Sequence, residues 1–217
     1  MDRMHRRGAC TLGSVSETVG VGPHPEPWPP GDHLDPELLA GGDRRNVVDR
    51  YRYWGVDAIK ADLDARRHPF HVAIENWEHD RNIGTVVRTA NAFAAAEVHI
   101  VGRRRWNRRG AMMTDVYQHV RHHASVEDLA AWAADEGLPI IGIDNLPGSV
   151  RMETTDLPER CVLLFGQEGP GLSPAARVAA EQVVSIAQFG STRSINAGVA
   201  AGIAMHAWIR RWAVPPN

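Results

Sequence analysis

The stretch NIGTVVRTA (residues 82–90) places a polar amide, a glycine and an arginine where they could meet one ligand. If a helix begins near Asn82, Arg88 projects from its second turn while Val86 and Val87 face apolar neighbours. The free N–H groups at the start of a helix bind anions, so this stretch is typical of an anion site. The alternative is that Arg88 is an ordinary surface residue of an alanine-rich helix.

A second segment, GQEGPGLS (residues 166–173), is rich in glycine. It reads G-x-x-G-x-G rather than the dinucleotide pattern G-x-G-x-x-G, and no Lys-Ser or Lys-Thr pair follows as in a P-loop. Three glycines still let main-chain N–H and C=O groups approach a ligand closely. Such a loop can recognise an adenine edge without a charged side chain. The alternative is a simple Gly-Pro turn into a helix.

A third segment, FGSTRSINAGVAAGIAMHAW (residues 189–208), joins a polar turn to a helix of small residues. Six of the eight residues from Ala197 to Ala204 are Ala or Gly, which predicts that other backbone passes close to this helix. Ser194 and Asn196 lie where the turn meets the helix, so both are candidates for holding the loop or a ligand.

The segment RRRWNRR (residues 103–109) carries five arginines around a tryptophan. Between Arg81 and His123 the chain has eight arginines and two acids, although its net charge is −2. Such a patch can neutralise phosphates, and the tryptophan can stack on a base. The alternative is a merely arginine-rich surface, because Arg greatly outnumbers Lys throughout this sequence. The candidate nucleic-acid contacts are Arg81, Arg103, Arg104, Arg105, Arg108 and Arg109.

Other kinds of site are disfavoured. His119, His122 and His123 lack paired cysteine or acidic ligands at a fitting spacing, so no metal site is expected. No G-x-S-x-G nucleophile motif is present, and Cys161 lies in an apolar run, where cysteine is an inert small hydrophobe. The sequence has two cysteines, Cys10 and Cys161, so no disulfide framework is expected. A reduced, cytoplasmic setting is expected instead. No stretch is apolar enough to span a bilayer.

The elements that must position these residues alternate between strands and helices. Apolar runs predict strands at residues 70–75, 97–102, 138–144, 161–166 and 182–187. Helical patterns predict helices at residues 82–96, 125–137 and 173–181, and a last helix from residue 197. This alternation is typical of an α/β fold with a parallel sheet covered on both faces, in which ligands bind beyond the carboxyl ends of the strands. The three polar segments follow the first, fourth and fifth predicted strands.

Three parts are expected along the 217 residues. Residues 1–43 are rich in Gly, Pro and polar residues and bury too little apolar surface to offset their ordering entropy, which predicts a flexible arm. Residues 44–68 have a roughly helical apolar spacing broken near Gly55, which predicts a helical extension. Residues 69–214 contain the alternating elements, and the chain length favours one such domain.

Together the three polar segments resemble the motifs of the SpoU group of SPOUT methyltransferases, which includes the TrmH-type RNA ribose methyltransferases. The family's N-x-G-x-x-x-R-T-A stands here as NIGTVVRTA, its F-G-x-E-x-x-G-L-S as FGQEGPGLS, and its I-P-x-x-G-x-x-x-S-L-N as IAQFGSTRSIN. The match covers about residues 70–212, in the family's order and at its spacing. The family's proline is Ala187 here, which predicts a looser loop, and its V-S-V is AGV (residues 197–199).

The resemblance implies S-adenosylmethionine as methyl donor and methyl transfer to a ribose 2′-hydroxyl of tRNA or rRNA. It implies a SPOUT fold with a C-terminal trefoil knot, an exception to the rule that chains do not thread their own loops. It also implies a homodimer whose active site both chains complete, with Ala197, Ala201 and Gly202 tightly packed at the contact. An alternative is a catalytically idle RNA-binding protein of the same fold.

The resemblance also implies roles for residues. The family's catalytic arginine, here Arg88, is either a general base or a phosphate anchor. Because arginine keeps its proton far above neutral pH, phosphate anchoring and charge stabilisation are favoured. The catalytic set is Arg88, Asn82, Glu168, Ser194 and Asn196. The implied cofactor contacts are Leu164, Phe165, Gly166, Gln167, Glu168, Gly169, Ile186, Gln188, Gly190, Ser194 and Ile195.

Overall fold

The computed structural model describes residues 20–76 and 82–213. The chain divides between Gly55 and Val56 into two compact units. This division falls inside residues 44–68, the segment expected as one helical extension. Helix α2 (Val56–Asp64) therefore belongs to the second unit, together with the sheet.

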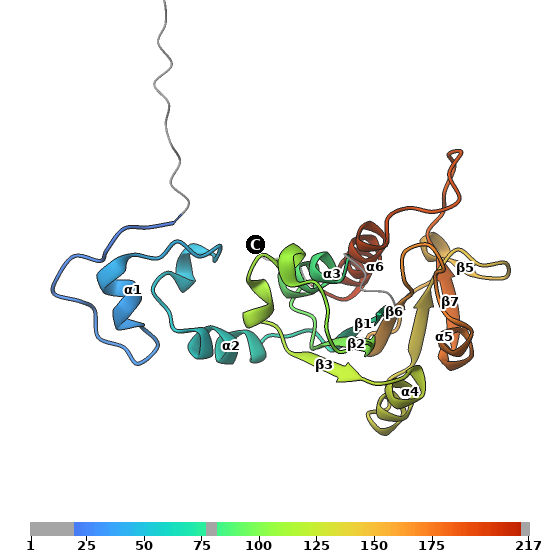
Figure 1. The fold of residues 1–217 in the computed structure, drawn as a ribbon, viewed down its shortest axis with the longest axis horizontal. Helices are drawn as coiled ribbons and strands as arrows, with labels where there is room; N and C mark the ends of the chain where they lie inside the picture. The colour runs from blue at the N-terminus through green and yellow to red at the C-terminus, as the bar shows by residue number, and fades with distance from the viewer. Residues whose placement is uncertain (1–19, 77–81, 214–217) are drawn as a thin grey trace, which may run out of the picture. The chain divides into compact units, whose positions relative to one another are not determined.

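The second unit is built on one seven-stranded sheet, in which every pair of neighbouring strands is parallel. The strand order is β3-β2-β1-β6-β4-β7-β5 (Figure 1). The strands are β1 (Phe70–Asn76), β2 (Val98–Gly102), β3 (Val120–His123), β4 (Ile140–Ile143), β5 (Val150–Arg151), β6 (Cys161–Phe165) and β7 (Gln182–Ser185). The predicted α/β fold with a parallel sheet is confirmed.

Helices cover both faces of this sheet, as the parallel arrangement requires. Helices α3 (Ile83–Ala92) and α6 (Ala197–Trp212) lie on one face, and α4 (Val126–Asp135) and α5 (Pro174–Ala179) lie on the other (Figure 1). Strand β6 is buried along its whole length, and burial raises the pKa of the Cys161 thiol to about 12. No helix in the described ranges is long and apolar enough to cross a bilayer.

Two strands, β3 and β5, were not predicted from the sequence. Strand β3 carries the exposed Val120 and Arg121 beside its histidines, so it lacks the apolar run of a buried strand. Strand β5 is only two residues long and exposed. Four short 3₁₀ helices were also not predicted: η1 (Asp49–Tyr51), η2 (Arg108–Ala111), η3 (Thr114–Val116) and η4 (Met152–Thr154).

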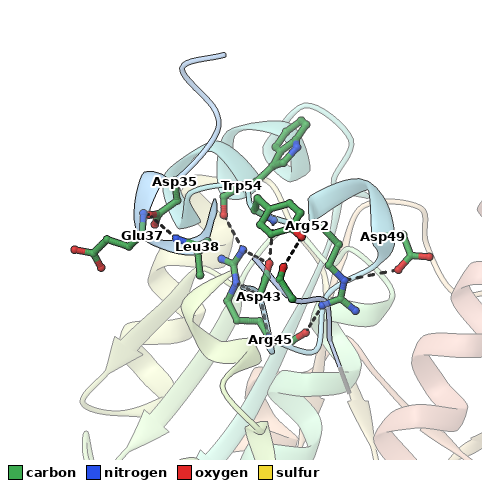
Figure 2. A network of polar contacts seen from close by, with 10 residues as sticks. Asp35, Glu37, Leu38, Asp43, Arg45, Asp49, Arg52 and Trp54 are labelled. Carbon is green, nitrogen blue, oxygen red and sulfur yellow. Dashed lines mark hydrogen bonds and ion pairs between the residues drawn. The ribbon is translucent and has the colours of Figure 1, made fainter. Parts of the chain in front are cut away.

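In the first unit, residues 20–55 form local structure around one buried carboxylate. Helix α1 (Pro36–Gly41) begins at Asp35, whose side chain accepts from two backbone N–H groups of the first turn. Asp43 is fully buried and pairs with Arg45 at 2.9 Å (Nε to Oδ1) and 2.7 Å (Nη2 to Oδ2), as Figure 2 shows. Burial alone would raise the pKa of Asp43, but hydrogen bonds from Arg45 and Tyr53 lower it to about 2. Within the arm predicted for residues 1–43, the described residues thus include helix α1 and a buried carboxylate that is paired with Arg45.

The small residues of helix α6 let helix α3 approach it. A Cβ placed on Gly198 would lie 3.2 Å from the Thr85 side chain, and one on Gly202 would lie 3.9 Å from that of Thr89. Ala201 is fully buried in the core of its own chain, together with Trp208. The expectation that Ala201 packs at a dimer contact is therefore wrong, because this side of α6 faces the sheet. The exposed apolar side chains of α6 are instead Val199, Ile203 and Trp212.

Three histidines form a hydrogen-bonded row on the face of the sheet that α4 covers. His71 Nδ1 lies 3.0 Å from His99 Nε2, and His99 Nδ1 lies 2.9 Å from His123 Nε2. The Trp132 ring covers the row, with its centroid 4.2 Å from that of His99. Burial, reinforced by the Arg121 charge, lowers the pKa of His71 to about 4 and that of His99 to about 2. The pKa of His123 is lowered by the same causes.

The same row includes a group of potential metal ligands within the described residues. One ligand atom each of His71, His99 and Glu97 lies within 4.8 Å of the others. The two imidazole nitrogens already share a hydrogen bond, and Glu97 forms an ion pair with Arg121 at 3.1 Å. In this structure the cluster is thus held by hydrogen bonds and an ion pair between side chains.

We expect the histidine row to make the stability of this unit fall with acidification. In the unfolded chain histidines titrate near pH 6.5, so between about pH 6.5 and 4 the unfolded state binds more protons than the folded state. The full stability is present above pH 6.5 and declines toward pH 4, by up to about 1.4 kcal/mol per pH unit for each buried histidine. Urea unfolding between pH 7 and 4 measures this slope. The variant His71→Gln should flatten it, whereas the exposed-site control His206→Gln should not. An unchanged slope in His71→Gln contradicts this assignment.

Candidate donor-binding and acceptor site

A cavity of about 300 Å³ opens beyond the carboxyl ends of β4, β6 and β7. These three strands are neighbours in the sheet, so the loops that follow them meet at one edge. Its lining is Ile143, Asp144, Asn145, Leu146, Phe165, Gly166, Gln167, Glu168, Gly169, Pro170, Gly171, Ile186, Gln188, Ser194, Ile195, Asn196, Ala197 and Ala200. The second and third polar segments of the sequence therefore surround one cavity, where the parallel-sheet rule places ligands.

Three polar side chains from the three motif segments meet beside this cavity. Asn82 donates to the Glu168 carboxylate, and Asn196 donates to Asn82 Oδ1 at 2.9 Å. Asn196 Nδ2 also lies 3.3 Å from Glu168 Oε2. The other side-chain atom of Asn196, Oδ1, caps helix α6 by accepting from the N–H groups of Gly198 and Val199. One residue thus fixes the start of α6 and the position of the carboxylate.

Asn82 does not cap its own helix with its side chain, although it occupies the N-cap position of α3. Its amide turns instead toward Glu168 and Asn196, which lie 86 and 114 residues further along the chain. The close approach of the three loops is therefore maintained by hydrogen bonds between their side chains. A cluster of one carboxylate and two amides can orient a hydroxyl group or its proton.

The loop after β6 closes on itself very tightly. A Cβ on Gly166 would lie 2.0 Å from the carbonyl carbon of Gly171 and 2.2 Å from the backbone nitrogen of Leu172. Real Cβ atoms do not approach backbone so closely, so only glycine fits at residue 166. Gly166, one of the residues expected at the cofactor, lies on the lining of this cavity.

The loop after β7 has a hydrogen bond at residue 187, where the resemblance predicted a looser loop. Ala187, which replaces the family's proline, donates its backbone N–H to Glu153 Oε1 at 3.0 Å. A proline has no N–H group to donate. In this chain the loop thus has a hydrogen bond to η4 that a proline at residue 187 could not form.

Most of the expected cofactor residues line the cavity. Phe165, Gly166, Gln167, Glu168, Gly169, Ile186, Gln188, Ser194 and Ile195 all do. Leu164 and Gly190 do not: Leu164 is buried within β6, and a Cβ on Gly190 would meet nothing within 4 Å. These two residues were expected at the cofactor with the others, and the cavity lining does not include them.

Arg88 lies outside the cavity. It is exposed on the second turn of α3, as predicted, but the cavity lining does not include it. Of the expected catalytic set, the structure brings together Asn82, Glu168 and Asn196, with Ser194 on the lining. Arg88 is therefore separated from the residues that line the cavity.

The arginine segment lies against the same helix. A Cβ on Gly84 of α3 would lie 2.8 Å from Gly110 Cα, so η2 packs on the first turn of α3. The neighbouring arginines Arg103, Arg104, Arg105, Arg108 and Arg109 are all exposed. Arg108 lies over the Trp106 ring, 5.5 Å from its centroid, and Trp106 packs partly against the core. Arg81 lies outside the described residues.

Sequence reasoning missed residues that hold these loops. Asn76, fully buried at the end of β1, donates to the carbonyls of Arg103 (2.6 Å) and Arg105 (3.0 Å) and so fixes the arginine segment. Asp144 and Asn145, directly after β4, line the cavity. The predicted strand 138–144 included Asp144, whereas β4 ends at Ile143, so the rule that ligands bind beyond the carboxyl ends of parallel strands was not applied to Asp144.

Comparison with known proteins agrees with this geometry. Residues 69–206 match the model of the family described as SpoU rRNA Methylase. A protein of Mycolicibacterium smegmatis named an uncharacterised tRNA/rRNA methyltransferase is 34% identical over 169 residues, 73% of this chain and 52% of its own length. The chain thus spans about half the length of the curated relatives it matches.

Solved structures give the same result. An AdoMet-bound rRNA methyltransferase from Sinorhizobium meliloti is 28% identical with a TM-score of 0.60, over 69% of this chain and 60% of that one. A structure described as giving insights into 2-OH methylation on tRNA is 25% identical with a TM-score of 0.58, over 66% of this chain and 96% of that one. The match to the family model covers more than half of the chain and contains all three motif loops, so the chain belongs to the SpoU rRNA methylase family.

Proposed function

We propose that this protein transfers a methyl group from S-adenosylmethionine to a ribose 2′-hydroxyl of tRNA or rRNA. The observation that carries the proposal is the meeting of Asn82, Glu168 and Asn196 beside a cavity built from the two glycine-containing loops. Relatives named as tRNA/rRNA methyltransferases and neighbours described with AdoMet and with 2-OH methylation support it.

The chemistry asks little of the protein beyond positioning. As the ribose oxygen bonds to the methyl carbon, the carbon–sulfur bond breaks, its electron pair stays on sulfur, and the hydroxyl proton passes to solvent water. Since the donor is already an activated sulfonium, holding the two reactants in line supplies much of the rate. Asn82, Glu168 and Asn196 shape the acceptor side of the cavity, and the backbone of the loops after β6 and β7 holds the donor.

The acceptor enters along the surface of α3. Arg88 and the exposed arginines of the 103–109 segment lie on and beside this helix, outside the donor cavity. Their positive charges suit the phosphates of an RNA strand. Of these arginines, Arg88 is the one that belongs to a motif segment. Arg88 then anchors the phosphate next to the reacting ribose.

The proposal includes the trefoil knot and the homodimer that the family resemblance implies. On this chain, a dimer contact along α6 is expected at the exposed Val199 and Ile203 rather than at Ala201. These two residues lie four apart and therefore on one side of the helix.

Calorimetric titration with S-adenosylmethionine tests the proposal against a catalytically idle RNA-binding protein of the same fold. The proposed function requires one donor per chain, bound with micromolar or tighter affinity. If RNA binds and the donor does not, the idle alternative stands and the proposed function fails.

Replacing Arg103, Arg104 and Arg105 together by alanine should weaken RNA affinity and flatten its dependence on salt. Fewer phosphates are neutralised, so fewer counterions are released on binding, and the slope of log K against log salt falls by up to about 0.9 for each lost contact. Single-turnover methylation at saturating RNA should recover much of its original rate. RNA affinity measured at several salt concentrations checks this, and an unchanged slope would show that these arginines do not contact phosphate.

A further inference from the structure

Asp144 is held rigidly at the cavity, although no motif includes it. Its Oδ2 accepts from the backbone N–H of Leu172 at 2.9 Å, and its Oδ1 accepts from that of Asn145 at 2.7 Å. A Cβ on Gly171 would lie 2.4 Å from Asp144 Oδ2, and Gly171 has a φ of +71°. The loop after β6 thus approaches the carboxylate so closely that residue 171 has to be glycine.

The same corner fixes the loop after β7. Asn145 Nδ2 donates to the carbonyl of Arg193 at 3.2 Å. The end of β4 therefore contacts both loops that surround the cavity, and the half-buried Asp144 carboxylate lies between them on the lining.

The charge of the lining is entirely negative among the described residues. Asp144 and Glu168 are its charged side chains, and neither Arg, Lys nor His is part of it. Glu168 is engaged with Asn82 and Asn196 on the acceptor side. A fixed carboxylate in a half-buried cavity favours a cationic ligand over a neutral one of the same shape.

We propose that Asp144 makes the cavity discriminate by charge, favouring the cationic sulfonium donor over its neutral thioether product. This inference rests on the proposed function. Methyl transfer removes the positive charge from sulfur, so the attraction to Asp144 is present before the reaction and absent after it. The carboxylate thereby promotes exchange of spent product for fresh donor.

The test compares three ligands on the 217-residue chain by calorimetry. S-adenosylmethionine carries the sulfonium charge, S-adenosylhomocysteine lacks it, and sinefungin has a charged amine near the same position. The Kd ratio of S-adenosylhomocysteine to S-adenosylmethionine is the readout, because a general distortion of the cavity weakens both ligands together. In Asp144→Asn this ratio should fall by about three- to tenfold, and sinefungin should lose affinity in parallel with S-adenosylmethionine.

Two variants serve as controls. Glu153→Gln removes a carboxylate that also accepts a backbone N–H from a cavity loop but lies outside the lining, so it should leave the ratio unchanged. Asp144→Glu retains the charge and should retain the ratio even if all affinities drop.

An unaltered ratio in Asp144→Asn, or an equal shift in Glu153→Gln, overturns the role of Asp144. If the unmodified protein binds none of the three ligands, the proposed function fails instead. The two failures are thus distinguishable.

Discussion

Arg88→Ala is expected to abolish methyl transfer while leaving the affinity for S-adenosylmethionine nearly unchanged. The structure supports this separation, because Arg88 is exposed on α3 and does not line the donor cavity. Its charge acts only when the ribose and its phosphate are present, and loss of one such stabilising group lowers catalysis by about two to three orders of magnitude.

Arg88→Lys sharpens this test. It retains a positive charge but loses the planar fork that grips a phosphate with two N–H groups, so it should also be badly impaired. Arg210→Ala, which removes an exposed arginine near the end of α6, is the matched control and should keep its rate. Single-turnover methylation at saturating RNA, together with donor calorimetry, measures both quantities. If Arg88→Ala keeps its saturating rate, the role assigned to it is wrong.

Gly166→Val is expected to eliminate donor binding. Its Cβ alone would collide with the backbone of Gly171 and Leu172, at distances of 2.0 to 2.2 Å, so the loop has to open. Neither collision involves a flexible side chain that could move away. Displacing the main-chain groups that hold the donor should weaken its binding by at least about a hundredfold, while overpacking of this kind costs about 1–3 kcal/mol of stability.

Gly190→Val is the matched control for this prediction. Gly190 lies in the other motif loop, outside the cavity lining, and its Cβ position is open. Both glycines were expected at the cofactor, so the structure separates two residues that the motifs treat alike. Calorimetry on both variants, with thermal unfolding to confirm that each is folded, decides the matter. Normal donor binding by Gly166→Val would place the donor elsewhere.

The sequence predicted the parallel sheet and the three motif loops because these depend on local patterns. Buried parallel strands are continuous apolar runs, and β6 is such a run from end to end. Strand β3 was missed because its exposed Val120 and Arg121 resemble a loop. The local structure of residues 20–43 was missed because it includes contacts that no local pattern encodes, such as the pairing of the buried Asp43 with Arg45.

The hydrogen bonds between side chains of the site could not be predicted from the sequence. The motif identified Asn82, but its side chain pairs with residues 86 and 114 positions away instead of capping α3. Such pairing depends on which strands are neighbours, and no local pattern encodes the strand order. Asp144 was missed for a different reason. It lies beyond the carboxyl end of β4, where parallel sheets bind ligands, but no family motif includes it.

The most direct measurement is mass spectrometry of nucleosides from tRNA and rRNA incubated with the protein and methyl-deuterated S-adenosylmethionine. The proposed function predicts a labelled 2′-O-methylnucleoside that appears with the wild-type chain and is absent with Arg88→Ala. A label confined to a base, or no label in RNA while the donor binds normally, would contradict it.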